Sequence, residues 1–400
     1  MAKNIVFCAD GTWNGPEEQT GNTVIAGPDD HGELPRSAVT NVVKLFSNLS
    51  GHVTPETLAL QNEQEKACSD AEGNVVQVAK YLHGVGDSSN PLVKALGGTL
   101  GMGVIGRIVR GYTFISRNYA AGDAIHIVGF SRGAYTARAL AGMIAKVGLL
   151  KPAYCDPARK LDAYRLGIAA WARSRSVMLG GAGKLDNIAR ALLEFVERCV
   201  AAQLPDDALI SDIPIKSVAV WDTVGSMGIP EYAGGRRIDV FRFVDSDLSD
   251  KVEYGFHAMA INEMRGDFPV TSWNVRQLGN IDQVWFVGAH ADVGGGYPSD
   301  ESRLSDIALQ WMTNKLSKLE VAFAAPAVYP SNPQVIGQNW HTPWEDPPFN
   351  ILLRTPRAVA PGDVIHATVK ERWEGDAAYR PDAMARFAGS GLGELKIQTS

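Results

Sequence analysis

A serine stands between Gly129 and Gly133 in the sequence GFSRG, where a predicted strand meets a predicted helix. Apolar residues over 124–130 predict the buried strand, and the helical spacing of apolar residues over 132–147 predicts the helix. A G-x-S-x-G pattern in this context is typical of a nucleophile elbow, a strained turn that raises the serine hydroxyl above the sheet. The two glycines remove side chains that would collide across the turn. The sequence therefore predicts Ser131 as a nucleophile.

A serine hydroxyl needs a general base and a group that orients the base. In an α/β hydrolase the chain order is serine, acid, histidine, and both partners follow later strands. Asp222 follows a predicted strand at 216–221, and His290 follows one at 284–287 and precedes three glycines. Asp292 is the alternative acid, although its position two residues from His290 suits a hydrogen bond that shapes the loop. The sequence leaves the choice between the two acids open.

Acyl transfer also requires preorganised N–H donors for the tetrahedral intermediate, the oxyanion hole. One predicted donor is the backbone N–H of Arg132, directly after the serine. The loop after the first predicted strand, 4–9, is the candidate source of the second, because Gly11 permits close backbone approach and Thr12 offers its N–H. Asp10 is expected to hold this loop in shape.

Three alternatives use the same residues. Carboxylates and an imidazole at predicted strand ends would suit a hard metal ion; these are Asp10, Asp222, His290 and Asp292. Asp-Gly-Thr after a first strand also occurs in haloacid dehalogenase phosphatases, but Cys8 replaces the nucleophilic aspartate of that class. A non-catalytic binding protein is the third alternative, because fold does not fix function. The favoured interpretation is a serine hydrolase that needs no metal and no cofactor.

The other histidines are weaker candidates. His126 lies inside a predicted strand and His257 in a segment with helical spacing, so both are expected to be core residues. The remaining ones have no comparable context; they are His31, His52, His83, His341 and His366.

Apolar strands alternate with helical segments, which predicts an α/β-hydrolase-like fold with a mostly parallel central sheet and flanking helices. No composition shift marks a linker, so residues 1–400 are predicted to form one domain. Residues 150–210 predict a helical insertion, a candidate lid or cap, with an apolar stripe over 185–200. Residues 326–361 hold eight of the 21 prolines. The whole of 326–400 is expected to pack on the domain as an irregular stretch and a tail.

Composition and charge argue against several classes of protein. The chain has 38 basic and 44 acidic residues and a formal net charge of -6. This balance disfavours nucleic-acid binding and general attraction to anionic membranes. The four cysteines lack zinc-site spacing. No segment approaches the roughly 20 apolar residues of a membrane-spanning helix, and the start lacks a signal-peptide pattern, so a cytoplasmic location is predicted.

An ordered series of motifs resembles the DUF2235 family of α/β hydrolases, which includes the Tle1-like phospholipase effectors of type VI secretion. The series comprises FCADGTWN at 7–14, GFSRGAY at 129–135, VWDTVG at 220–225, HAMAINEMR at 257–265, WFVGAHADVGGGY at 285–297 and LSDIA at 304–308. It spans roughly residues 3–315 and is specific because the order of the motifs is kept.

The resemblance implies that Ser131 is the nucleophile, His290 the base and Asp222 the acid. It implies hydrolysis of carboxylic esters, above all lipid or phospholipid acyl esters, through an acyl-enzyme. The expected substrate is then a lipid ester, reached by transient contact with a membrane surface. For an effector, the resemblance also implies an immunity or secretion partner and export by a type VI apparatus.

Overall fold

The computed structural model describes residues 2–11, 38–58, 63–83, 100–179, 204–224, 231–233, 236–238, 247–274, 280–347, 349–351 and 353–399. A central sheet runs through these ranges. Its strands are β1 (Asn4–Ala9), β2 (His52–Val53), β3 (Glu63–Ser69), β4 (Val75–Leu82), β5 (Ala124–Phe130), β8 (Ile215–Trp221), β11 (Val252–Ala260), β12 (Ile281–Phe286), β13 (Val364–His366) and β14 (Lys396–Gln398).

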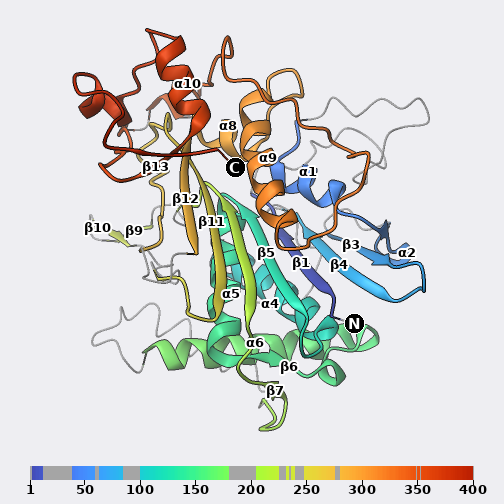
Figure 1. The fold of residues 1–400 in the computed structure, drawn as a ribbon. Helices are drawn as coiled ribbons and strands as arrows, with labels where there is room; N and C mark the ends of the chain where they lie inside the picture. Colours follow the sequence, from blue (N-terminus) through green and yellow to red (C-terminus); the bar gives the residue numbers. More distant parts are fainter. Residues whose placement is uncertain are drawn as a thin grey trace.

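The sheet is mostly parallel. Its strand order is β14-β13-β12-β11-β8-β5-β1-β4-β3-β2. Neighbours from β14 to β4 pair in parallel, whereas β3 and β2 pair antiparallel at one edge. The carboxyl ends of β5, β8 and β12 therefore share one edge of the sheet, where side chains from distant parts of the sequence can meet (Figure 1).

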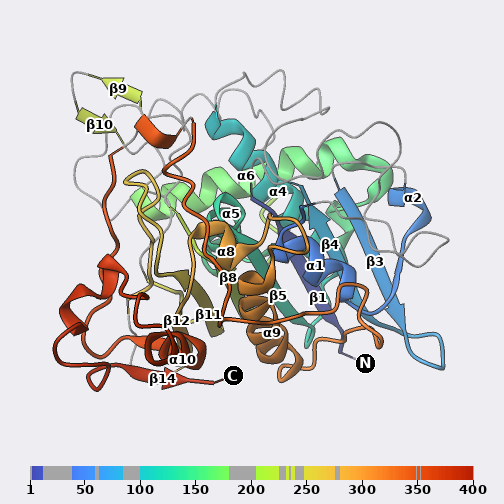
Figure 2. The same cartoon turned by 90° about the horizontal axis from the view of Figure 1, so that it is seen from above.

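Helices cover both faces of the sheet (Figures 1 and 2). One face carries α1 (Asn41–Asn48), α8 (His290–Gly294), α9 (Arg303–Ser317) and α10 (Ala367–Gly375). The other carries α4 (Leu100–Asn118), α5 (Arg132–Val147) and α6 (Lys160–Leu179). The shorter elements are α2 (Pro55–Leu58), the pair β6 (Leu149–Leu150) and β7 (Leu209–Ile210), and the pair β9 (Glu231–Ala233) and β10 (Arg236–Ile238).

Side chains alternate between the two faces along each strand, as strand geometry requires. In β1, Ile5 and Phe7 pack with α4 and α5, whereas Val6 and Cys8 pack with α1 and α9. Because both faces are covered, the central strands are apolar nearly throughout their length. The parallel pairing of β5 with β1 and β8 sets its register, and so the place where Ser131 leaves the sheet.

The predicted fold class is confirmed: the structure has a mostly parallel central sheet with helices on both faces. The predicted elements at 4–9, 124–130 and 132–147 have the predicted bounds. The assignment of His257 to a helix is wrong, because this residue lies inside β11. That strand is buried on both faces, and a short apolar run does not distinguish a strand from a helix.

The predicted insertion at 150–210 is described in part. Its helix α6 packs on α4 and α5, and a Cβ at Gly167 would meet Val109 Cγ1 at 2.8 Å. The apolar stripe at 185–200 lies outside the described residues, so the lid stays a prediction. Among the described residues of 326–361, the chain forms the 3₁₀ helix η3 (Phe349–Ile351).

The close packing of α5 on the sheet gives a stability test. A Cβ at Gly133 would lie 2.1 Å from the carbonyl oxygen of Ala9, so Gly133→Ala is expected to lower the free energy of unfolding by about 3 kcal/mol. At Gly142, in the same helix, a Cβ would meet nothing within 4 Å. Gly142→Ala should therefore raise stability by about 0.5–1 kcal/mol, since alanine favours helix. Urea unfolding followed by circular dichroism measures both. Equal effects would contradict the close approach.

Candidate active site

Ser131 occupies a strained turn between β5 and α5. Its backbone φ of 56° lies in the left-handed region that residues other than glycine rarely adopt. The turn is tight because a Cβ at Gly129 would lie only 2.5 Å from the carbonyl oxygen of Gly133. The loop after β1 lies directly against it, since a Cβ at Gly11 would be 3.2 Å from Ser131 Cβ. These contacts give Ser131 the geometry expected of a nucleophile elbow.

The loop after β1 is organised by the fully buried carboxylate of Asp10. Asp10 Oδ1 accepts from the backbone N–H of Gly11 at 2.7 Å, and Oδ2 accepts from Tyr81 Oη at 2.8 Å and Thr40 Oγ1 at 2.9 Å. Burial raises the pKa of Asp10 to about 6, although these hydrogen bonds act to lower it. The Gly11 N–H is therefore bound to Asp10 and is not free to serve in the oxyanion hole. The other predicted donor of this loop, the N–H of Thr12, lies outside the described residues.

His290 and Asp222 meet at the carboxyl edge of the sheet. Asp222 follows β8 with a φ of 38°, and His290 begins α8 after β12. His290 Nδ1 lies 2.6 Å from Asp222 Oδ2. With Nδ1 turned toward the carboxylate, Nε2 is the nitrogen that remains for proton transfer. Burial lowers the pKa of His290, and the hydrogen bond to Asp222 only partly offsets this, so the imidazole is held neutral.

Arg357 holds the other side of the Asp222 carboxylate. Its Nη1 donates to Oδ1 at 2.6 Å and its Nη2 donates to Oδ2 at 2.9 Å. Burial acts to raise the pKa of Asp222, but the charge of Arg357 and the bond to His290 outweigh it, so the pKa lies well below its usual range. Sequence reasoning missed Arg357. It lies in the proline-rich stretch, where no motif surrounds it.

The ring of His290 is packed between aromatic side chains. Its centroid lies 4.6 Å from that of Phe130 and 5.2 Å from that of Phe268. Its backbone N–H donates to Glu263 Oε2 at 3.2 Å, and Glu263 is in turn held by Arg265. Sequence reasoning also missed the role of this Glu263–Arg265 ion pair, although both residues lie in the HAMAINEMR motif. Together these contacts fix the direction of the imidazole.

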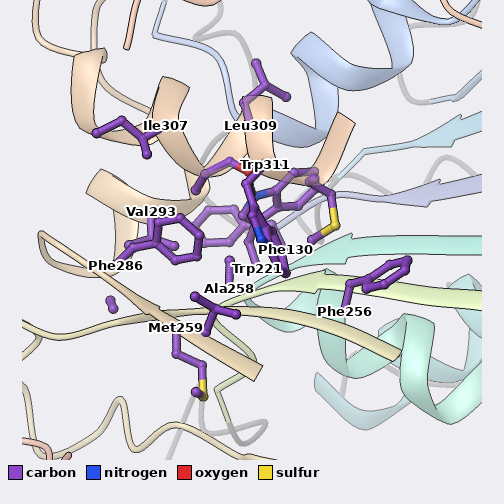
Figure 3. Packing of buried hydrophobic residues seen from close by; sticks show 14 of the residues in the cluster. Phe130, Trp221, Phe256, Ala258, Met259, Phe286, Val293, Ile307, Leu309 and Trp311 are labelled. Atoms are coloured by element: carbon purple, nitrogen blue, oxygen red, sulfur yellow. Dashed lines mark hydrogen bonds between the residues drawn. The ribbon is translucent and has the colours of Figure 1, made fainter. Parts of the chain in front are cut away.

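A buried apolar cluster packs against α8. Figure 3 shows Phe130, Trp221 and Trp311 packed together beside Val293 of α8. Trp221 Nε1 also donates to the carbonyl oxygen of Ala308 in α9 at 3.3 Å. In the described part of the chain, His290 bonds Asp222 through Nδ1 and Glu263 through its backbone N–H, and no direct hydrogen bond joins it to Ser131 Oγ. Such bonds are often long in unliganded enzymes and tighten when substrate binds.

Asp292 has partners of its own, away from His290. Its Oδ2 accepts from the backbone N–H of Ala289 at 2.9 Å and from that of His341 at 2.9 Å. Its Oδ1 lies 2.6 Å from His341 Nδ1, and the His341 ring stacks on Tyr297 with centroids 3.4 Å apart. The structure thus brings Asp222, and not Asp292, into contact with His290.

The carboxylates that could have formed a metal site are separated by their partners. Asp10 bonds Tyr81, Asp222 bonds Arg357, and Asp292 bonds His341. Within the described ranges, no cluster of three or more histidine, cysteine or acidic residues has the arrangement of a metal site.

A mostly parallel sheet with a serine on a strained strand–helix turn, and a histidine–carboxylate pair at the same edge, defines an α/β-hydrolase-like protein. The chain belongs to the family described as the catalytic domain of Tle1-like phospholipase effectors of the type VI secretion system, whose model matches residues 3–315.

Two further similarities cover parts of longer proteins. The chain is 31% identical to the uncharacterized protein YEL023C of Saccharomyces cerevisiae over 148 residues. This aligned segment is 37% of this chain and 18% of the yeast protein. A solved structure of the Tle1 effector bound to the VgrG spike is 17% identical with a TM-score of 0.31, over 76% of this chain and 53% of that one. In the described part of the chain, none of the helices has the length and apolar character to cross a bilayer.

The contact between His341 and Asp292 predicts a pH-dependent contribution to stability. Burial acts to lower the pKa of His341, but the bonds to Asp292 and Glu301 outweigh it and the pKa is raised. The stabilisation is therefore complete below the unfolded pKa of about 6.5 and is lost as pH rises through the raised folded value. His341→Gln should lose more unfolding free energy at pH 6 than at pH 8.5. The exposed His52, replaced by Gln, is the control, and a pH-independent deficit in His341→Gln would contradict the prediction.

Proposed function

We propose that this protein is a serine esterase that cleaves acyl esters of lipids, most of all phospholipids, through an acyl-enzyme. The observation that carries the proposal is the 2.6 Å contact between His290 Nδ1 and Asp222, at the sheet edge where Ser131 occupies its strained turn. Family membership supports the lipid substrate. It also supports export by a type VI apparatus, and with it a partner in that apparatus.

In the acylation step, His290 Nε2 takes the proton of Ser131 Oγ as this oxygen attacks the ester carbonyl carbon. Asp222 holds the imidazole in the required tautomer and stabilises the imidazolium. The negative oxygen of the tetrahedral intermediate is received by backbone N–H groups, for which Arg132 and Thr12 are the proposed donors. When the intermediate collapses, the C–O bond to the alcohol breaks and His290 gives its proton to the leaving oxygen.

In the deacylation step, water attacks the acyl-enzyme and His290 takes its proton. The new intermediate collapses to a free fatty acid, and the proton returns to Ser131 Oγ. Burial keeps the pKa of His290 low, which leaves the imidazole neutral and able to act as base. The ionised Asp222 does not change its protonation state through the cycle.

The nucleophile is tested by Ser131→Ala. Loss of the hydroxyl removes the acyl-enzyme route, so ester hydrolysis should fall by about 10³-fold or more with the fold unchanged. Hydrolysis of p-nitrophenyl butyrate and of phosphatidylglycerol vesicles, with fluorophosphonate labelling, measures the effect. The exposed Ser299→Ala is the control and should keep both activity and labelling. Labelling that survives in Ser131→Ala would overturn the assignment.

The acid is tested by comparing two aspartates. Asp222→Asn should lower turnover by about 10⁴-fold, because the amide holds the wrong histidine tautomer. Asp292→Asn should cost much less, since its carboxylate contacts His341 and not His290. Steady-state kinetics of both variants under identical conditions gives the ranking. The reverse order would move the acid to Asp292.

A further inference from the structure

We propose that Arg357 is a positioning residue of the active site, which fixes the Asp222 carboxylate and sets the pH range in which His290 acts as base. This inference rests on the proposed function, because it assigns a role within the same site. It also extends the catalytic unit beyond residues 3–315, the part of the chain that the family model matches.

Four hydrogen bonds to three residues hold the guanidinium of Arg357. Besides its two bonds to Asp222, Nη1 donates to the carbonyl oxygen of Ala260 at 2.8 Å and Nη2 to that of Phe268 at 2.8 Å. The side chains of Arg357 and Asp222 are only 4% and 0% exposed. A bidentate pair between planar groups sets the plane of the carboxylate as well as its position. Asp222 can then accept from His290 in one orientation only.

The backbone that carries Arg357 is itself anchored to the loop after β11. Thr355 donates its N–H to the carbonyl oxygen of Met264 at 2.7 Å, and Gly266 donates to that of Leu353 at 2.8 Å. Val359, on the other side, donates to the carbonyl oxygen of Ala383 at 2.9 Å. Arg357 is therefore delivered to Asp222 by a strand-like segment with bonds on both sides. This anchoring separates it from surface arginines that pair by chance.

The positive charge also acts on the base through Asp222. Asp222 Oδ2 accepts from both His290 Nδ1 and Arg357 Nη2. A carboxylate paired with a cation attracts an imidazolium less strongly than a free carboxylate does. Removing the cation should therefore raise the pKa of His290. The other charged groups that act on His290 stay in place in this comparison; they are Glu263 and Arg265, after β11.

The test uses the full chain with Arg357→Met, which keeps much of the side-chain volume. It removes both the charge and the fork, the pair of N–H groups that bond the two oxygens of Asp222. We expect kcat/KM for p-nitrophenyl butyrate to fall by about 10²-fold, the cost of a small misplacement of reacting groups. The acid limb of the kcat/KM profile should move up by roughly one pH unit, as His290 regains attraction to a free carboxylate. Low, non-denaturing guanidinium should restore part of the activity.

Arg354→Gln is the matched control. Arg354 lies in the same stretch but donates to the carbonyl oxygen of Trp344 at 3.2 Å and does not touch Asp222. It should keep wild-type activity and pH profile. Arg357→Lys retains the charge without the fork, so it should lose turnover while its acid limb stays close to that of wild type. This variant decides the question if Arg357→Met does not fold.

The outcomes separate this inference from the proposed function. No hydrolysis and no fluorophosphonate labelling in the wild type would overturn the proposed function. An active, labelled wild type with Arg357→Met unchanged in rate and acid limb would overturn the role of Arg357 alone. Full activity in Arg357→Lys would show that the fork is not needed. A purely structural role predicts fewer folded molecules with an unmoved acid limb in those that remain, and that result would also overturn the proposal.

Discussion

The structure depends on one close approach of backbones, where the first turn of α5 meets the ends of β1 and β5. Gly133 lies so near the carbonyl oxygen of Ala9 that no Cβ fits between them, and a Cβ at Gly129 would lie 2.5 Å from the carbonyl oxygen of Gly133. This contact holds Ser131 in its strained conformation. It also brings Gly11 against Ser131, so the loop after β1 and the start of α5 face the same point. A methyl group at Gly133 would push α5 away from β1 and separate Ser131 from the loop after β1.

Buried charge at the sheet edge is divided among separate partners. Four carboxylates gather there, each satisfied by its own donors; they are Asp10, Asp222, Glu263 and Asp292. An unpaired buried carboxylate is costly, and the pairing removes that cost. It also decides which acid reaches His290, since the other three are engaged elsewhere or bind only its backbone. The division of partners is thus a condition of specificity as well as of stability.

Local signals in the sequence predicted the central elements well. The strand at 124–130, the helix at 132–147 and the glycines of the turn could be read directly, because each depends on its near neighbours. The rule that parallel strands end at one edge predicted that Asp222 and His290 lie at the same edge of the sheet, but left open whether Asp222 or Asp292 pairs with His290. Arg357 could not be predicted in this way. Its partner lies 135 positions away, and the stretch that carries it has neither helical nor strand periodicity.

Other failures have the same origin. His257 lies in a strand buried on both faces, so its apolar neighbours carry no period-2 signal. His341 lacks any local context in the sequence, yet it is the partner of Asp292 because the proline-rich stretch runs over the start of α8. Side chains that satisfy buried charges are chosen by three-dimensional proximity, which a single sequence does not record.

The long separation between Asp222 and Arg357 also fixes an order of assembly. Proteins are synthesised from the N-terminus at about 5–20 residues per second, so the 135 positions between the two charges correspond to roughly 7–27 seconds. Strands β5 and β8 exist as chain when that interval begins and β12 is made within it, and throughout it Asp222 lacks its partner Arg357. A nascent chain interrupted after residue 290 and before residue 357 contains Ser131, Asp222 and His290 but lacks Arg357, which pairs with Asp222. The charge balance of the site is therefore reached only when synthesis has passed the proline-rich stretch.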